Sequence, residues 1–397
     1  MFVKDSVNIL LVGISGYGGE YLRELLAYKD KTIRLTGVVD IAPQKSDYYD
    51  TIIDRGIPIY NSLEEYYDNE QAELAIISTP IHFHRDHSCY CMNHGSHVLC
   101  EKPMTSDPQD IQQMINVRNK TGKFLAIGFN WSFAPSTLEL KEDINKGAFG
   151  RPIRLKSMMQ WSRNKAYYNR SVWAGKMYDA EGSMIFDSVA NNATAHFLHH
   201  LLYLLGDRID TSAQLDTVTA ELYRVNHIET FDTCAVQLKT KDDVDIYFYA
   251  THAVREDMGP FFQLEFEKAT ITYNVNENSK EVVAVWKDGT QKTYENPEEY
   301  HLSKLSTCIN AVLTEDNWVP CGPEAASAQV KSIQAMHKSV PNIMSFPESL
   351  IHYDIKEEKY WIQGLSEDLL HCYNNWCLPN ELDIQWSAIG GKIRLED

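Results

Sequence analysis

The chain has 397 residues, enough for two domains of ordinary size, and its hydrophobic and charged fractions are 44% and 23%. The formal net charge is −18, and the 37 Lys and Arg residues form no basic cluster. Because an acidic surface repels phosphate backbones, we expect no nucleic-acid partner. The sequence has no continuous apolar run of the length needed to span a membrane.

The start of the chain and the cysteines indicate a cytoplasmic protein. The apolar run before Gly13 is short and lacks a small-residue cleavage pattern, so we expect no signal peptide. The eight cysteines are scattered and no CxxC pair occurs, which argues against a zinc knuckle or a thioredoxin-type motif. We therefore expect reduced thiols and no bound metal.

The first 130 residues alternate between strand-like and helix-like segments. Apolar or β-branched runs predict strands at 7–12, 33–39, 74–77, 97–100 and 124–128. Helical patterns lie at 17–26 and from Asp107-Pro108, an N-cap followed by a first-turn proline, to Gly122. This alternation is typical of a doubly wound parallel sheet.

The pattern changes near residue 129. A helix at 136–146 and a strand at 152–161 precede a polar and aromatic stretch, 162–182, and a helix that ends at Leu205 before Gly206. Strand-like segments follow at 217–225, 230–238, 244–252, 261–266, 270–275 and 282–286, then helices at 298–313, 323–339 and 364–376. We predict an α/β protein with a dinucleotide-binding domain at 1–128 and a second domain, built on a large mostly antiparallel sheet, at 129–397. C-terminal segments that fold back onto the first domain are an alternative.

A glycine loop lies between the first strand and the first helix. The sequence from Gly13 to Gly19 fits GxxGxxG at Gly13, Gly16 and Gly19, whereas GxGxxG read from Gly16 fails at Tyr21. Glycines permit a tight turn, and the helix N-terminus offers N–H groups to a pyrophosphate. A glycine turn without a cofactor is the alternative interpretation.

Asp40 ends the second predicted strand, 22 residues after Gly18. An acidic residue at about 20 positions after the loop hydrogen-bonds the adenosine ribose in dinucleotide-binding folds. Its carboxylate would repel a 2′-phosphate, so the sequence favours NAD over NADP. A turn residue after a strand is the alternative.

Ser78-Thr79-Pro80, His84 and the run from His94 to Pro103, which contains Glu101-Lys102-Pro103, resemble the glucose–fructose oxidoreductase / inositol dehydrogenase (Gfo/Idh/MocA) family. The resemblance continues through 146–152 and resumes at 196–206. It implies a Rossmann domain followed by an α/β domain with a large open sheet, a nicotinamide cofactor, and Lys102 in the active site. The lysine ammonium would hydrogen-bond a substrate hydroxyl or polarise a carbonyl; a solvated surface lysine is the alternative.

Cofactor contacts are expected at the glycine loop and after the following strands. The expected residues are Gly13, Ser15, Gly16, Tyr17, Gly18, Gly19, Asp40, Ser78, Thr79, Pro80, His84, Glu101 and Lys102. The histidines His82, His84, His87, His94 and His97 are dense here, but no set of carboxylates accompanies them. We therefore favour surface and sheet-edge histidines over a metal site.

The resemblance also implies a catalytic pair near the helix before Gly206, an Asp and, four residues later, a His that takes the hydroxyl proton. His196 falls on the family's His, whereas Asn192 stands where the family has Asp. A spacing of four would put both on one helix face. A neutral amide orients an imidazole but does not stabilise its cation, and Asp187 is the nearest upstream carboxylate that could substitute if the chain bends.

The stretch 167–176 is both aromatic and cationic, which suits a polyol, and Arg170 or Lys176 would suit a carboxylated sugar. Packing of this loop against the sheet is the alternative interpretation. For His199 and His200, which follow His196 on the predicted helix, the alternative is that they pack within the protein. The expected substrate-binding residues are Lys102, Tyr168, Arg170, Trp173, Lys176, Asn192, His196 and His199, with His252 as a further candidate.

Together these features predict an NAD(P)-dependent oxidoreductase that transfers a hydride between the nicotinamide and a secondary alcohol or ketone of a sugar, sugar derivative or cyclitol. Two alternatives stay open: NAD-dependent redox-assisted glycoside cleavage, and a non-catalytic sugar or dinucleotide sensor. We expect a small sugar or polyol as the partner, and a homodimer or homotetramer formed through the second domain's sheet.

Overall fold

The computed structural model describes residues 6–29, 32–276 and 280–395, and the chain divides into two compact units. The first unit runs to Phe133 and also contains Tyr300–Ala326; the second contains Ala134–Glu299 and the residues from Ser327 onward. The sequence placed all of 129–397 in one domain. The return of Tyr300–Ala326 to the first unit is the folding back that the sequence left as an alternative.

A parallel six-stranded sheet forms the centre of the first unit, with the strand order β3-β2-β1-β4-β5-β6. The strands are β1 (Val7–Val12), β2 (Ile33–Val39), β3 (Ile59–Tyr60), β4 (Leu74–Ile77), β5 (His97–Cys100) and β6 (Leu125–Ile127). The order reverses between β1 and β4, as in Rossmann folds. Strands β4 and β5 are buried at every residue, which explains why they read as continuous apolar runs. The predicted doubly wound sheet is confirmed.

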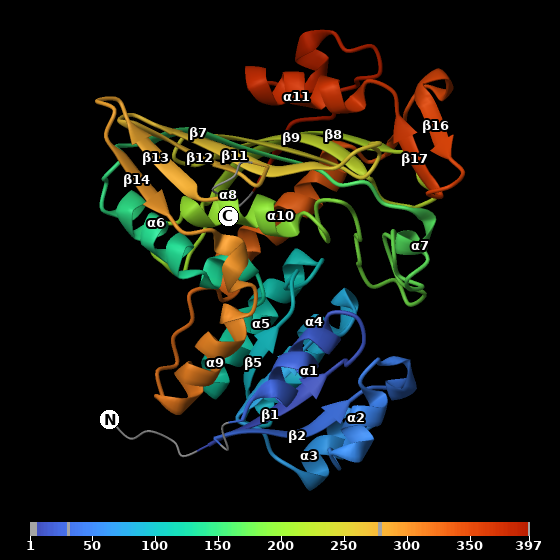
Figure 1. Cartoon of the computed structure of the whole chain (residues 1–397), viewed down its shortest axis with the longest axis vertical. Coiled ribbons are helices and arrows are strands. Elements are labelled where there is room, and N and C mark those ends of the chain that lie inside the picture. Colours follow the sequence, from blue (N-terminus) through green and yellow to red (C-terminus); the bar gives the residue numbers. More distant parts are fainter. Residues whose placement is uncertain (1–5, 30–31, 277–279, 396–397) are drawn as a thin grey trace. The chain divides into compact units, whose positions relative to one another are not determined.

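Within the described ranges, six α-helices lie wholly in the first unit, and all six are labelled in Figure 1. They are α1 (Gly18–Ala27), α2 (Tyr49–Asp54), α3 (Leu63–Asn69), α4 (His84–Asn93), α5 (Pro108–Thr121) and α9 (Ser303–Leu313). Helix α5 begins as predicted, because the Asp107 side chain accepts from the Gln109 N–H. The sequence missed α2, α3 and α4; the buried side of α4 carries His84, Ser88 and two cysteines, so it has little apolar periodicity.

A ten-stranded, mostly antiparallel sheet forms the second unit, with the order β14-β13-β12-β11-β7-β10-β9-β8-β15 and β18 paired with β8. The strands are β7 (Pro152–Gln160), β8 (Leu215–Arg224), β9 (Thr233–Thr240), β10 (Asp245–Thr251), β11 (Met258–Phe266), β12 (Ala269–Asn274), β13 (Val282–Trp286), β14 (Gln291–Tyr294), β15 (Met344–Ser345) and β18 (Ile393–Arg394). Strand β7 pairs in parallel with β10, and β15 with β8. The predicted large sheet is confirmed.

The remaining elements flank this sheet. They are the helices α6 (Pro135–Asn145), α7 (Lys165–Tyr168), α8 (Ala195–Leu204), α10 (Pro323–Ser339) and α11 (Leu365–Asn375), and the hairpin β16 (Ile351–Asp354) and β17 (Lys359–Ile362). Helix α10 begins in the first unit and continues into the second. None of the helices within the described ranges has the length and hydropathy that a bilayer crossing requires.

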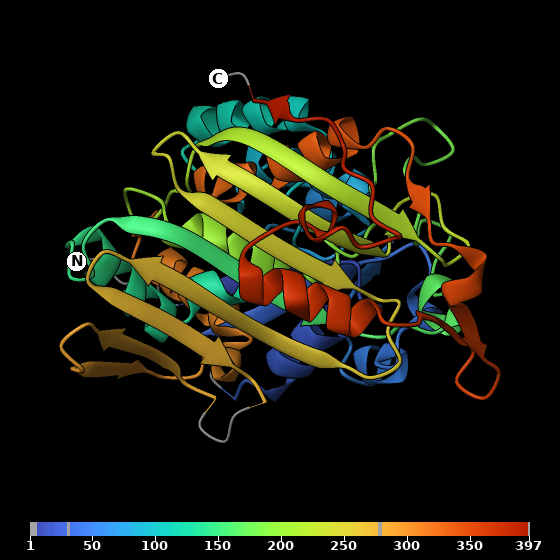
Figure 2. The ribbon, with the colours of Figure 1, turned by 90° about the horizontal axis from the view of Figure 1, so that it is seen from above.

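The chain covers part of its own large sheet with α11, which lies over the strands on one face (Figure 2). Leu365 and Leu369 of α11 pack into a buried cluster with Met158 of β7 and Tyr249 of β10. The Lys156 ammonium donates to the carbonyl oxygen of Tyr373, 2.7 Å away, and burial lowers the pKa of Lys156 to about 8. The covered part of this face is therefore not available for assembly between copies of the chain.

Leu369→Ala tests whether α11 is part of the core. Leu369 is completely buried, so we expect the free energy of unfolding in guanidinium chloride to fall by about 2–5 kcal/mol. The matched control is Ile355→Ala, since Ile355 is 84% exposed and should change it by less than about 0.5 kcal/mol. Equal effects of the two substitutions would contradict the packing of α11 described above.

Candidate functional site

The glycine loop joins β1 to α1 at the carboxyl end of the parallel sheet. Gly13 has a φ of +83°, and a Cβ there would lie 2.6 Å from the carbonyl oxygen of Ser78. Gly16 has a φ of +58°, and a Cβ on Gly18 would lie 2.1 Å from the carbonyl oxygen of Gly13. Glycine is therefore required by conformation or by close approach at each of these positions. The loop leads directly into α1, whose N-terminus is the end that attracts anions.

Asp40 holds this loop in place through hydrogen bonds to its backbone. Its Oδ2 accepts from the Ile14 N–H at 2.9 Å, and its Oδ1 accepts from the Ala42 N–H at 2.8 Å. The Ser46 hydroxyl donates to the carbonyl oxygen of Ile14 at 2.9 Å. Each carboxylate oxygen has two lone pairs, so Asp40 can also accept from ribose hydroxyls. The structure gives Asp40 a structural role in addition to the cofactor contact that its spacing predicts.

His84 connects two of the predicted cofactor segments. Its Nδ1 lies 2.7 Å from the carbonyl oxygen of Pro103, and its Nε2 lies 2.8 Å from that of Thr79. The ring is buried, and burial lowers its pKa although both carbonyls favour the charged form. His84 therefore holds protein backbone in place. Among the described residues, no group of three or more His, Cys, Asp or Glu side chains is placed to hold a metal ion.

A buried ion pair supports Lys102. The Lys304 ammonium of α9 donates to Oε1 of Glu101 and to the carbonyl oxygen of Gly128, 3.1 Å away. The Tyr21 hydroxyl donates to the same Oε1 at 2.6 Å, and the Lys102 N–H donates to Oε2 at 3.2 Å. Burial alone would raise the pKa of Glu101, but Lys304 and Tyr21 outweigh it and hold that pKa below its usual range. With these partners the Glu101 carboxylate holds the backbone of Lys102 in place, and the cofactor contact expected for Glu101 stays a prediction.

Lys304 and Tyr21 were not expected from the sequence. The signal for Lys304 is its place in an otherwise apolar helix face, since Leu305, Cys308 and Val312 are buried on the same helix. A lysine on such a face needs a buried partner because an unpaired buried charge is costly. Lys102 itself lies at the carboxyl end of β5, the edge where ligands bind in sheets of this kind.

In the second unit, Asn192 lies before α8 and not on it. Helix α8 begins at Ala195, whereas the Asn192 N–H donates to the carbonyl oxygen of Ser188 at 3.0 Å. The prediction that Asn192 and His196 share a helix face is therefore wrong. The physical reason is a tight turn ahead of the helix, in which the Thr194 hydroxyl and N–H both donate to the carbonyl oxygen of Val189.

Asp187 supplies the negative charge that Asn192 lacks. The Asn192 amide donates to Oδ1 of Asp187 at 2.6 Å, while Arg170 and the Gly175 N–H donate to Oδ2 at 3.1 and 2.7 Å. Asp187 is only 4% exposed. The chain bends just before it, because Phe186 has a φ of +47°. The sequence required a bend of the chain for Asp187 to substitute for the missing carboxylate, and this bend is present. The Asp187 carboxylate is hydrogen-bonded to the Asn192 side chain.

The cations of the aromatic stretch already have carboxylate partners. The Arg170 guanidinium pairs with Asp187 and lies over the rings of Tyr167 and Trp173, at 4.0 and 5.0 Å from their centroids. The Lys176 ammonium lies 2.7 Å from Oε1 of Glu229. A carboxylated sugar would have to compete for both cations. The geometry therefore favours an uncharged ligand for this stretch.

Several buried polar atoms near the same stretch have no hydrogen-bond partner among the described residues. They are the Tyr168 hydroxyl, the Ser171 hydroxyl and Nε2 of His252. The Tyr167 ring lies next to both neighbours, 5.2 Å from the Tyr168 ring and 5.6 Å from the His252 ring. Burial and Arg163 lower the pKa of His252 to about 3. Buried polar groups are normally satisfied, so these atoms mark a place where ligand hydroxyls or water would be bound.

His199 and His200 belong to the packing of α8. Both are buried, and the His199 ring stacks on Tyr203, whose own ring lies under the Lys141 ammonium. Burial, followed by Lys141, lowers the pKa of His200 to about 3. The structure thus supports the packing alternative for both histidines over the substrate contact expected for His199.

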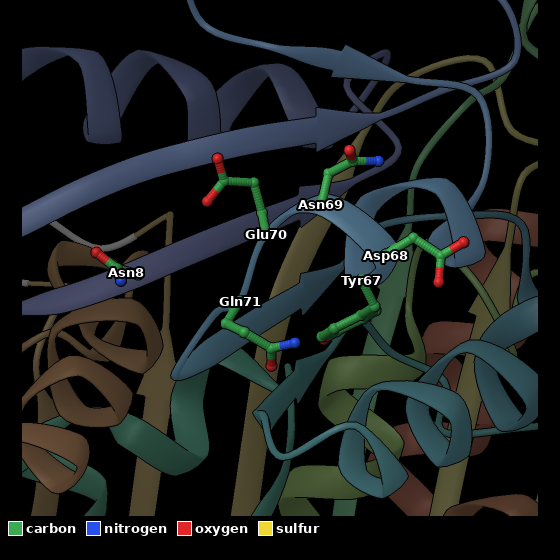
Figure 3. A pocket seen from close by; sticks show the side chains of 6 residues that line it. All are labelled: Asn8, Tyr67, Asp68, Asn69, Glu70 and Gln71. Atoms are coloured by element: carbon green, nitrogen blue, oxygen red, sulfur yellow. The ribbon is translucent and has the colours of Figure 1, made fainter.

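A polar pocket of the first unit lies elsewhere (Figure 3). Its lining residues are Asn8, Tyr67, Asp68, Asn69, Glu70 and Gln71. They come from the end of α3, the turn before β4 and the start of β1, which is the amino-terminal edge of the parallel sheet. Cofactors bind at the opposite, carboxyl edge, so this pocket is not part of the candidate site.

Two family models match the chain. The model described as "Oxidoreductase family, NAD-binding Rossmann fold" matches residues 7–129, and the model of the GFO/IDH/MocA C-terminal domain matches residues 137–272. Together the two matches cover more than half of the chain.

Curated relatives match over limited stretches. A 1-carboxy-3-chloro-3,4-dihydroxycyclohexa-1,5-diene dehydrogenase from Comamonas testosteroni is 29% identical over 37% of each chain. A D-glucoside 3-dehydrogenase from Escherichia coli is 33% identical over 20% of this chain and 22% of its own length. The match thus spans well under two thirds of these relatives.

The fold also occurs in solved structures. The WlbA dehydrogenase from Bordetella pertussis, solved with NADH and UDP-GlcNAcA, superposes with a TM-score of 0.68 at 18% identity, over 85% of this chain and 97% of that one. At this identity the similarity shows the fold alone.

Lys304→Met tests the buried pair. The substitution leaves the Glu101 carboxylate buried without its cation, so we expect the free energy of unfolding to fall by about 3–5 kcal/mol. Stability should partly return in the double variant with Glu101→Gln, which removes the unpaired charge. Lys331→Met, at an exposed position of α10, is the control and should have little effect on unfolding in denaturant. A Lys304→Met protein as stable as this control would contradict the pair.

Proposed function

Since the chain belongs to the GFO/IDH/MocA oxidoreductase family and carries its NAD-binding Rossmann domain, we propose that it transfers a hydride between NAD and a secondary alcohol or ketone of a sugar, sugar derivative or cyclitol. The observation that carries the proposal is Lys102 at the carboxyl end of β5, in the same unit as the glycine loop, with its backbone held by the buried Glu101–Lys304 pair. NAD accepts or returns the hydride when bound. NAD is favoured over NADP because Asp40 offers only a carboxylate at the ribose position.

We assign the proton chemistry to four side chains. The Lys102 ammonium hydrogen-bonds the substrate oxygen and stabilises negative charge that develops on it. His196 takes the hydroxyl proton as the hydride leaves. Asn192 orients the imidazole, and Asp187 polarises the Asn192 amide through their 2.6 Å hydrogen bond. In the family an Asp contacts the histidine directly, whereas here the carboxylate of Asp187 acts on His196 through the Asn192 amide.

An uncharged polyol fits the aromatic stretch best. Arg170 and Lys176 are paired with carboxylates, and the Tyr168 hydroxyl and Nε2 of His252 are buried and lack partners among the described residues. Hydroxyl groups both donate and accept, so one polyol can satisfy a hydroxyl and an imidazole nitrogen together. We therefore infer a neutral sugar or cyclitol as the substrate class.

NADH formation is the direct test of the proposed activity. The purified chain with NAD is assayed at 340 nm against neutral aldoses, glycosides and inositols, and we expect turnover with at least one of them. Lys102→Ala should lower kcat/KM by at least about 100-fold, whereas Lys331→Ala should not change it. Release of an aglycone without net NADH would favour redox-assisted glycoside cleavage. NAD binding without turnover of any member would count against the proposal and favour a sensor.

A charge exchange between Asp187 and Asn192 tests the assignment of the negative charge. Asp187→Asn should lower kcat by about 10²- to 10⁴-fold, because no carboxylate then stabilises the protonated imidazole. Asn192→Asp alone should also lower it, since two carboxylates would lie within hydrogen-bond distance and repel. The double variant Asp187→Asn/Asn192→Asp restores one carboxylate and should recover part of the activity.

Asp210→Asn, which removes the carboxylate of an exposed ion pair with Arg208, is the control for this exchange. A fully active Asp187→Asn enzyme would show that Asp187 is structural only. If the activity losses of the two single variants add up in the double variant, Asp187 would likewise be structural only.

A further inference from the structure

The returning segment Tyr300–Ala326 reaches the glycine loop. Its helix α9 packs against β1, β4, β5 and the short 3₁₀ helix η3 (Asn130–Phe133), all in the first unit. Lys304, near the start of α9, lies 4.5 Å from the centroid of the Tyr17 ring. Tyr17 is the residue of the glycine loop directly before α1. A segment about 280 residues later in the chain therefore lies against the predicted pyrophosphate site.

His301 joins the two sides of this site. Its Nε2 lies 2.8 Å from the Tyr17 hydroxyl, and its Nδ1 lies 2.9 Å from Nδ2 of Asn130, the residue that follows β6 by three positions. The His301 side chain is exposed to solvent, whereas Asn130 is 6% exposed. One imidazole thus connects the loop after β1 with the chain after β6, at the carboxyl edge of the sheet, where Rossmann folds bind dinucleotides.

The partners of His301 allow it to be neutral or charged. With the Asn130 Nδ2 donating, Nδ1 accepts, so the ring proton is on Nε2 and is donated to the Tyr17 oxygen. Protonation of Nδ1 requires an acceptor there, and rotation of the Asn130 amide supplies its Oδ1, which is buried and has no partner among the described residues. His301 can therefore take up a proton while it keeps both contacts.

We propose that His301 is a cofactor-binding residue that links the affinity for NAD to its own protonation. The proposal deepens the function proposed above and rests on it only through the cofactor. The pyrophosphate carries a fixed negative charge, and an imidazolium beside the N-terminus of α1 attracts it. Imidazole titrates near pH 6.5, so the attraction is present in mildly acidic solution and is lost as the pH rises.

The charge of the cofactor determines the direction of this effect. His301 faces the Tyr17 phenol just before α1 and the neutral Asn130 amide of η3, and on its own segment the Lys304 ammonium also lies against the Tyr17 ring. Lys304 is neutralised by Glu101 of the β5 end, to which Tyr21 also donates. The pyrophosphate is an anion, and an anion beside an imidazole favours its protonated form, so bound NAD shifts the titration of His301 upward.

NADH binding, followed by its fluorescence without any substrate, is the test. For the unmodified chain we expect the Kd to increase by about three- to tenfold between pH 6 and pH 8.5. His301→Gln keeps a neutral side chain with a donor and an acceptor, and should bind with the weaker Kd at every pH. His94→Gln replaces an exposed histidine of the same unit, at the end of α4, and should behave as the unmodified chain.

A second measurement does not depend on the variant folding. Histidine Cε1–H NMR signals of the unmodified chain are titrated with and without NADH. One signal should show a higher pKa in the complex, and proton uptake should appear as a buffer-dependent binding enthalpy. The proposal is overturned if NADH affinity and histidine pKa values are independent of each other, or if His301→Gln keeps the pH dependence. Tight, pH-independent NADH binding would overturn the role of His301 and leave the oxidoreductase proposal intact, whereas no NADH binding at all would overturn both.

Discussion

The Glu101–Lys304 pair is the interaction on which the cofactor unit depends. Two charges with almost no exposure are stable only if they compensate each other and if their other bonding capacity is satisfied. Tyr21, the Lys102 N–H and the carbonyl oxygen of Gly128 complete the set. The pair thereby connects α1, the end of β5, the end of β6 and the returning helix α9. The first unit is discontinuous in sequence, and its central cation comes from the segment Tyr300–Ala326, after residues 134–299 of the second unit.

The second unit also contains a buried charged group that is paired, the Asp187 carboxylate. Asp187 has little exposure, and its carboxylate accepts from Arg170, from Asn192 and from the Gly175 N–H. Asn192 then presents a polarised amide where a carboxylate would otherwise stand. An arrangement of this kind spreads one negative charge over two residues and ties it to the loop that carries Tyr167 and Trp173. The position of that loop and the position of the Asn192 amide are therefore coupled through Asp187.

Local patterns predicted the elements with strong signals. Strands β1, β2, β4, β5 and β13 begin and end where apolar and β-branched runs predicted. The helices α2 and α3 were missed because they have only six and seven residues, too few for a clear helical period, and α4 was missed because its buried face mixes polar and apolar side chains. The spacing of four between Asn192 and His196 placed both residues on one helix. In the structure α8 begins only at Ala195, after a turn at 189–194 that residue spacing does not indicate. The expected carboxylate-binding role of Arg170 and Lys176 was weakened by partners that only the fold brings near.

The sequence alone indicated the fold class from its alternating apolar runs, the glycine loop from conformations that no other residue adopts easily, and Asp40 from its spacing after that loop. The resemblance to a known family singled out Glu101-Lys102-Pro103. Tertiary structure decided which charges neutralise one another. Glu101 and Lys304 are 203 residues apart, Tyr17 and His301 are 284 apart, and Asn192 meets Asp187 only through a bend at Phe186. Long-range pairs leave no periodic trace in a sequence, since burial in a shared interior, and not spacing, selects the partner.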